Sequence, residues 1–342
     1  MEGKLRSTDV NPHIFTLEQT SASDPDLFLS DITQLFQRQA KENMYPYIYS
    51  SPNPEIENDL ACGETHYNDL IYNVPDYYLY REEIKILQHS VEDLAAQIPE
   101  NATIIEFGVG TEIAFRNKTL PLLKATEKLA RYVPIDLCVT YLTQAQSVMD
   151  QELPQVAFQG IETDFVKNVA IVQEFENPVV FFKGSTITNL RPEQCIDFFQ
   201  RLAEVLPTDG LLIVGEDSNP DESSLRKAYV NEPLANTMLS VFYRLKRDYA
   251  IQDFTPNGFN YRFDWLPQEY CVRHTAVATE SQRFTLNNTA IEIQKDDEFH
   301  TVSSYKYPIE FFQDMAKQGG LESVAVFSKA PNPMVVHVFK KH

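Results

Sequence analysis

This sequence lacks paired cysteines and an excess of positive charge. Its four cysteines, Cys62, Cys138, Cys195 and Cys271, are widely spaced and form no C-x-x-C pair, so neither a zinc site nor a disulfide framework is expected. We expect four buried, reduced thiols and no metal site. The 29 lysines and arginines are outnumbered by 49 aspartates and glutamates, which gives a net charge of -20. Nucleic acid is therefore not expected as a partner, because binding to phosphates needs clustered basic side chains.

Long apolar runs are also missing. Nowhere do the roughly 18 uncharged apolar residues of a membrane-spanning helix follow one another, and Met1–Asn11 lacks the apolar core of a signal peptide. We therefore expect a cytoplasmic protein with no membrane partner. The chain has 342 residues, 43% of them hydrophobic, so it can bury a full core. Its length suggests two domains, or one large domain with a cap.

Short apolar runs alternate with helical spacing from about residue 82 to about residue 216. The expected strands are Thr103–Phe107, Tyr132–Ile135, Val156–Phe158, Val179–Phe182 and Leu211–Val214. Helical spacing between them, as in Pro192–Val205, predicts a parallel, doubly wound α/β sheet. Near the end of the chain, Ser323–Phe327 and Met334–Phe339 read as strands joined by a proline-rich turn, which predicts a terminal hairpin.

Two regions outside this alternation predict a second, discontinuous domain. Residues 222–248 carry a long helical pattern, and Thr289–Gln294 alternates like a strand. Residues 51–64 contain Pro52, Pro54 and Gly63 and predict a loop or lid. The predicted domains are residues 81–219 with 305–342, which form the sheet, and residues 1–80 with 220–304, which form the second domain.

A glycine turn follows the first expected strand. The run Ile104–Thr111 reads IIEFGVGT, and its glycines at positions 108 and 110 allow the backbone to approach a ligand closely. A dinucleotide site would need a third glycine at position 113, which is Ile113. Glu106 ends this strand and Asp136 ends the next one, an arrangement that is typical of an S-adenosylmethionine (SAM) site.

Several strings in the sequence together resemble one enzyme family. They are Val74–Glu83 (VPDYYLYREE), the turn at 106–111, Pro134–Asp136, Thr163–Phe165, Phe182–Leu190 (FKGSTITNL) and Ser303–Tyr307 (SSYKY). As a set they resemble the histidine-specific, SAM-dependent Nα-methyltransferases of the ergothioneine pathway and their relatives, from about Tyr45 to the C-terminus. The resemblance implies a Rossmann-like methyltransferase sheet with a terminal β-hairpin, and a discontinuous α+β substrate-binding domain.

The resemblance implies SAM as the cofactor and assigns residues to it. Gly108, Lys118 and Asp136 fall on the family's cofactor positions, and a carboxylate at Asp136 suits the two ribose hydroxyls. Asp164 would accept a hydrogen bond from the adenine amino group, and Phe165 would stack on the ring or close its pocket. Two alternatives stay open: Asp164 as a helix N-cap, and Lys118 as an ordinary exposed helix lysine.

The resemblance also assigns an amino-acid substrate site. Asn189 would bind the α-amino or carboxylate group of the substrate, and Tyr229 would hold the carboxylate. Tyr49 and Tyr77 would line the amine site, where aromatic faces attract a methylated, permanently cationic amine. An alternative is that these two are simply members of a tyrosine-rich chain, which has 17 tyrosines.

The chain departs from the family where a histidine side chain would bind. Val302 stands in place of the imidazole-binding glutamate, Arg273 falls on the position of an apolar pocket residue, and Ser304 remains. Loss of the acid removes a charge-assisted hydrogen bond worth about 1.5 to 3 kcal/mol. We expect an N-methyltransferase of the α-amino group of a free amino acid or close derivative, other than or less specific than histidine, and a monomer or weak dimer. The alternatives are a histidine methyltransferase and a SAM-binding protein without catalysis.

Overall fold

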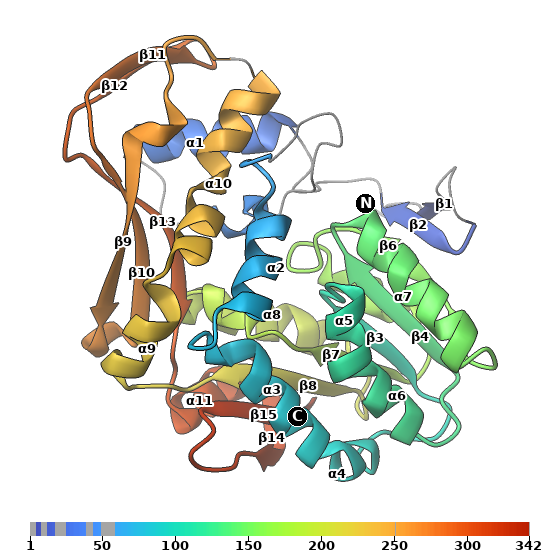
Figure 1. The fold of residues 1–342 in the computed structure, drawn as a ribbon. Coiled ribbons are helices and arrows are strands. Elements are labelled where there is room, and N and C mark those ends of the chain that lie inside the picture. The colour runs from blue at the N-terminus through green and yellow to red at the C-terminus, as the bar shows by residue number, and fades with distance from the viewer. Residues whose placement is uncertain are drawn as a thin grey trace. The chain divides into compact units, whose positions relative to one another are not determined.

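The chain folds into two compact units, which we describe separately (Figure 1). The computed structural model describes residues 5–7, 12–17, 25–38, 44–48, 59–249 and 251–341. The first unit comprises Met1–Ser21, Leu79–Ser218 and Tyr307–His342, and the second comprises Ala22–Tyr78 and Asn219–Lys306. Within the described ranges, no helix combines the length and the apolar character needed to cross a membrane.

A ten-stranded mixed sheet is the centre of the first unit. Its order is β1-β2-β6-β4-β3-β7-β8-β15-β14, with β5 paired to β4. The strands are β1 (Leu5–Ser7), β2 (Ile14–Leu17), β3 (Thr103–Phe107), β4 (Arg131–Asp136), β5 (Ala157–Phe158), β6 (Gly160–Glu162), β7 (Pro178–Phe182), β8 (Leu211–Asp217), β14 (Leu321–Phe327) and β15 (Met334–Lys341). The strands β6, β4, β3, β7 and β8 are parallel, and the hairpin of β14 and β15 is antiparallel. The expected α/β sheet with a terminal hairpin is thus confirmed.

Helices cover this sheet and complete its core. They are α3 (Tyr78–His89), α4 (Val91–Ala95), α5 (Glu112–Ala114), α6 (Leu120–Ala125), α7 (Val139–Glu152), α8 (Pro192–Val205) and α11 (Ile309–Gln318). On α8 the buried Cys195, Phe198, Phe199 and Leu202 follow the i, i+3, i+4, i+7 spacing of an amphipathic helix. The ring of Phe199 lies 5.5 Å from that of Phe312 on α11, centroid to centroid, so the two helices share one apolar layer.

The N-terminal strands differ from the predicted domain division. Residues 1–80 were expected in the second domain, but β2 pairs in parallel with β6, with Ile14 opposite Gly160. Ile14 is fully buried, and the Thr16 hydroxyl donates to the Glu162 carboxylate (2.8 Å). A short strand that extends a sheet through long-range pairing carries no periodic signal of its own, which explains why it was not expected.

In the described part of the second unit, four α-helices accompany two antiparallel sheets. The helices are α1 (Pro25–Phe36), α2 (Gly63–Asn73), α9 (Glu222–Tyr229) and α10 (Glu232–Tyr249), and the strands are β9 (Phe259–Leu266), β10 (Cys271–Ala278), β11 (Gln282–Leu286), β12 (Thr289–Ile293) and β13 (Glu298–Tyr305). Strand order is β13-β10-β9 in one sheet, and β11 and β12 form a hairpin. The helical pattern at 222–248 is broken at Asn231, whose side chain donates to the Ala228 carbonyl (2.9 Å) and accepts from the Leu234 N–H (3.0 Å).

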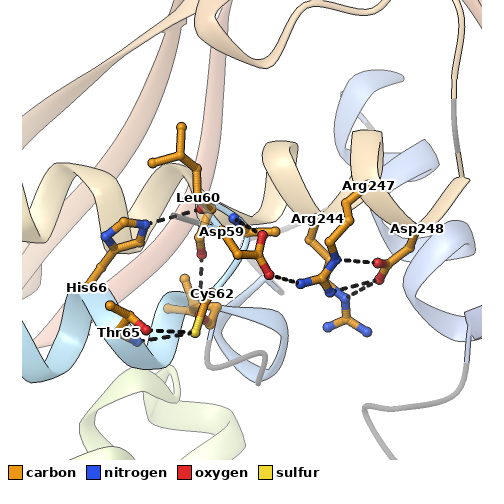
Figure 2. A network of polar contacts seen from close by, with 11 residues as sticks. Asp59, Leu60, Cys62, Thr65, His66, Arg244, Arg247 and Asp248 are labelled. Atoms are coloured by element: carbon orange, nitrogen blue, oxygen red, sulfur yellow. Dashed lines mark hydrogen bonds and ion pairs between the residues drawn. The ribbon is translucent and has the colours of Figure 1, made fainter. Parts of the chain in front are cut away.

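A polar network fixes the beginning of α2 to the end of α10 (Figure 2). Arg247 donates to Asp59 (2.6 Å) and to its neighbour Asp248 (2.6 Å), and Cys62 Sγ accepts from the Thr65 N–H (3.4 Å) at the start of α2. Of the predicted loop or lid at 51–64, residues 51–58 lie outside the described residues. Its last part is therefore an anchored segment that leads into a helix.

Candidate functional site

The glycine turn after β3 is held by hydrogen bonds from two sides. Gly108 and Gly110 have φ angles of 77° and 66°, in the left-handed region that favours glycine. The Gly108 N–H donates to the Ile135 carbonyl on β4 (2.8 Å). From the other side, the Lys183 ammonium donates to the carbonyls of Gly108 (3.0 Å) and Val109 (2.8 Å). These bonds fix the turn, and Gly108 and Gly110 add no side chains to its surface.

Asp136 joins this turn from the end of β4. Its two carboxylate oxygens accept from the N–H groups of Gly110 (3.2 Å) and Cys138 (3.0 Å). Burial raises the pKa of Asp136, and the two backbone hydrogen bonds oppose this shift by favouring the charged form. Because a carboxylate oxygen can accept more than one hydrogen bond, Asp136 keeps further acceptor capacity of the kind that a pair of ribose hydroxyls needs.

Phe165 and Asp164 lie beside the same turn. The Phe165 ring stacks on that of Phe107, with centroids 5.0 Å apart and planes 7° apart. A Cβ atom at Gly108 would lie 3.6 Å from Phe165, so the half-buried ring borders the glycine turn. Asp164 accepts from the N–H groups of Val166 (3.0 Å) and Lys167 (3.3 Å) through one oxygen. This is capping chemistry at a turn, and the role in adenine binding stays a prediction.

Lys118 is a buried residue, so the alternative of an exposed helix lysine is wrong. It lies in the π-helical turn Phe115–Thr119, is 6% exposed, and its ammonium pairs with Glu83 and sits 4.6 Å from the Tyr80 ring centroid. Burial lowers the pKa of Lys118, whereas the adjacent Glu83 charge raises it. Its predicted role in cofactor binding is untested by this geometry.

Glu106 ends β3 inside a second buried polar cluster. It pairs with Lys183 (2.8 Å), accepts from the Thr119 hydroxyl (2.7 Å) and is hydrogen-bonded to Tyr132. Burial, followed by the Glu106 charge, raises the pKa of Tyr132, which therefore remains a phenol. Sequence reasoning missed Lys183, which is the charged residue within the string FKGSTITNL.

Asn189 lies at the end of the short 3-10 helix Thr186–Asn189 in the first unit. Two left-handed residues, Gly184 (φ 83°) and Ser185 (φ 53°), redirect the chain between β7 and this helix. Asn189 is half-buried. Of the substrate residues proposed from sequence, Tyr49 lies outside the described residues, and the others belong to the second unit.

Tyr77 and Tyr229 meet in a buried aromatic cluster of the second unit. Their rings are edge to face with centroids 6.1 Å apart, and Tyr229 also lies 6.3 Å from Phe263 and 5.4 Å from His274. The Lys306 ammonium donates to the Tyr229 hydroxyl (2.9 Å). Sequence reasoning missed Lys306, although it stands in the string SSYKY. The two tyrosines assigned to one substrate are therefore brought together.

Arg273 does not share a face with Val302 and Ser304. In the antiparallel pair of β10 and β13, Arg273 is opposite Ser303, whereas His274 is opposite Val302. Because side chains alternate between the faces of a strand, Val302, Ser304 and His274 lie on one face and Arg273 on the other. The expectation that Arg273 lines a pocket with Val302 and Ser304 is thus corrected.

His274 occupies the place at which Arg273 was expected. Its Nδ1 is hydrogen-bonded to the Tyr261 hydroxyl (2.8 Å) and its Nε2 to the Ser304 hydroxyl (3.2 Å). Burial, with a contribution from the Lys306 charge, lowers the pKa of His274 to about 3, so the imidazole is neutral. The hydroxyl of Ser304 is therefore engaged by an imidazole that belongs to the protein.

Comparisons with known proteins show which proteins this chain is similar to. Residues 29–341 match the family model of the histidine-specific, SAM-dependent methyltransferases. A histidine N-alpha-methyltransferase of Mycolicibacterium smegmatis is 27% identical over 260 residues, which cover 73% of this chain and 79% of that protein. A 4-dimethylallyltryptophan N-methyltransferase of Arthroderma benhamiae is 25% identical over 306 residues, or 82% of this chain and 87% of that protein.

Proposed function

Because this chain belongs to the histidine-specific, SAM-dependent methyltransferase family, we propose that it methylates the α-amino group of a free aromatic amino acid or a close derivative. Histidine is at most one of its substrates. The negative net charge of -20 supports a small-molecule substrate over nucleic acid. A cytoplasmic location and a monomeric or weakly dimeric state complete the proposal.

The observation that carries the substrate class is the face shared by Val302, Ser304 and His274. Val302 is 3% exposed and offers an aliphatic surface instead of a carboxylate. Ser304 is already hydrogen-bonded to His274. An imidazole buried against this face would leave an N–H unsatisfied, at a cost of about 1 to 3 kcal/mol. The face therefore favours a side chain whose binding depends on apolar contact.

The surrounding rings favour an aromatic side chain in particular. Phe263 is opposite His274 in the sheet, and the Tyr229 ring packs against Phe263, His274 and Tyr77. Aromatic pairs contribute about 0.5 to 1.5 kcal/mol beyond the area they bury. The named substrates of the relatives are consistent with this chemistry, since histidine and 4-dimethylallyltryptophan are both aromatic amino acids.

The residues around the glycine turn suit SAM. The turn at Gly108, the half-buried Phe165 ring and the Asp136 carboxylate belong to one edge of one sheet. We propose that SAM lies against the backbone of the Gly108 turn. The Phe165 ring would contact its adenine, and the Asp136 carboxylate would bind its ribose. When bound, SAM would supply a methyl group: the amine lone pair forms the new C–N bond as the C–S bond breaks, the neutral thioether leaves, and the proton lost by the amine passes to solvent.

The protein's own contribution is largely positional. We propose that Asn189 binds the amino group of the substrate and so aims its nitrogen, and we separately propose a carboxylate-binding role for the Tyr229 hydroxyl. Orientation of reacting groups supplies about 7 to 11 kcal/mol in favourable cases. The rings of Tyr77 and Tyr229 would also attract the amine as methylation makes it a fixed cation, an effect of about 0.5 to 2 kcal/mol.

Turnover of SAM with each of the twenty amino acids, followed by mass spectrometry of the products, tests the proposal. We expect Nα-methylated products, with tryptophan, tyrosine or phenylalanine used better than histidine. Preference for histidine over all others would support the plain family activity instead. Tight SAM binding without any methylated product from a wider amine panel would favour a SAM-binding protein without catalysis.

A further inference from the structure

Glu83 lies in α3 where three separate segments of the first unit meet. Its carboxylate pairs with the Lys118 ammonium and accepts from the Gly184 backbone N–H (2.5 Å). Glu83 is 1% exposed, so both bonds are shielded from water. A charge pair buried in this way is sensitive to loss of either partner, because the remaining charge is then uncompensated.

The loop after β7 depends on this carboxylate on one side and on the glycine turn on the other. Lys183 donates to the carbonyls of Gly108 and Val109, and its neighbour Gly184 donates to Glu83. Gly184 and Ser185 are both left-handed, which is an uncommon conformation for serine. The loop then enters the short helix that ends at Asn189, so these bonds set the direction from which Asn189 is presented.

Gly215 on β8 leaves the space that the Glu83 carboxylate fills. A Cβ atom at this position would lie 2.7 Å from Glu83 Oε1, closer than such atoms approach. The Gly215 backbone lies outside the left-handed region, so alanine is free of backbone strain there. Gly215→Ala is therefore a steric probe of the Glu83 carboxylate that leaves its charge in place.

We propose that Glu83 is a positioning residue that couples the cofactor site to the amine site. One oxygen holds Lys118, and the other holds the loop that carries Asn189. This inference rests on the proposed function, in which Asn189 binds the amino acid, and on the family resemblance, which assigns Lys118 to SAM. Glu83 acts through these two residues.

Two variants separate the two halves of this role. Gly215→Ala displaces the oxygen that holds Gly184, so we expect the KM of the amino acid to rise about tenfold or more while the SAM Kd stays within twofold. Glu83→Gln keeps an acceptor for Gly184 but removes the charge beside Lys118. We expect it to weaken SAM binding about tenfold, and more strongly as pH rises from 7 to 9, because the lysine then loses its proton more easily.

The charged groups around Lys118 are Glu83, Lys183 and Glu106, so the pH profile reports on this cluster. Glu83→Gln/Lys118→Met removes both charges of the pair and should bind SAM weakly without the added pH dependence. The double variant also leaves no unpaired buried charge, so it can be measured if Glu83→Gln alone misfolds. Glu82→Gln is the matched control, because the Glu82 carboxylate pairs with Lys85 on its own helix, and it should leave both constants within twofold.

Calorimetric titration of SAM, kinetics with the preferred amino acid, and thermal denaturation distinguish the outcomes. If Glu83 only stabilises the core, Glu83→Gln and Gly215→Ala will lower the Tm and the active fraction while the SAM Kd and the amino-acid KM stay unchanged, which would overturn the proposal. If the wild type methylates no amino acid, the proposed function fails. The SAM titration then still decides the Lys118 half of the coupling on its own.

Discussion

Combining Val302→Glu with His274→Met tests how the substrate side chain is selected. Val302 and His274 are register partners on one face of the second unit's sheet. The Cα atoms of such partners are about 4.5 to 5.5 Å apart. A carboxylate introduced at position 302 alone would therefore meet the imidazole of His274 before it meets a substrate. Replacing His274 with methionine, an apolar side chain that adapts to its surroundings, leaves the new carboxylate for a substrate imidazole.

The size of the effect follows from the bond that would be gained. A charge-assisted hydrogen bond is worth about 1.5 to 3 kcal/mol, and about 1.4 kcal/mol corresponds to tenfold in a specificity constant. We expect the double variant to raise the ratio of kcat/KM for histidine over tryptophan by about 10- to 100-fold. Val302→Glu alone should raise it less than tenfold. Both variants should lower the Tm, because burial of a valine side chain stabilises by about 1.5 to 3 kcal/mol.

Steady-state kinetics with histidine, tryptophan, tyrosine and glutamate measure this ratio. Arg273→Met is the matched control: Arg273 lies on the opposite face of β10, so the ratio should stay within twofold. Two results would refute the reasoning. One is a wild-type enzyme that prefers histidine to the other three amino acids, and the other is a folded double variant with an unaltered ratio.

Three further perturbations test the cofactor site, the carboxylate anchor and the buried imidazole. Gly108→Asp should abolish SAM binding in a folded protein, because it adds strain and a charge where the backbone approaches the ligand; unchanged calorimetric affinity would contradict the site. Tyr229→Phe should lower kcat/KM for the amino acid about 10- to 100-fold with near-normal SAM affinity, since one charge-assisted bond is lost; equal use of decarboxylated amines would contradict it. The pKa of His274 is about 3 in the folded chain and near 6.5 in the unfolded chain. As the pH is lowered, the unfolded chain therefore binds a proton first, and the free energy of unfolding decreases from about pH 6.5 down to about pH 3. In this pH range, His274→Gln should reduce the slope of the free energy of unfolding against pH by about 1.4 kcal/mol per pH unit. Equal slopes for the wild type and the variant would argue against a neutral buried imidazole.

The parallel part of the sheet was predictable because its strands are buried on both faces. Such strands read as continuous apolar runs, and β3, β7 and β8 were found in this way. The short strands β2 and β6 were not expected. They have three or four residues each and exist through pairing with neighbouring strands of the sheet, so no local pattern marks them.

The second unit shows where periodicity alone is insufficient. One helical pattern at 222–248 is divided into α9 and α10 because the Asn231 side chain satisfies backbone groups of both helices. Nothing in the apolar spacing reveals this break, since both helices bury their apolar residues at helical intervals. Asparagine is a preferred N-cap residue, so it was the available signal.

The substrate face depends on a still finer property, the register of β10. A shift of one residue moves every side chain of a strand to the other face of its sheet. The family resemblance assigned Arg273 to the substrate pocket, in an alignment that could slip by one residue, whereas the register places His274 opposite Val302. This single step changes the chemistry of the site. A flexible, always charged guanidinium would pair with an acidic or phenolic substrate, while a buried neutral imidazole binds Tyr261 and Ser304 and leaves the face apolar. The substrate class that we propose is therefore a consequence of strand register, which the residue types at positions 273 and 274 could not reveal.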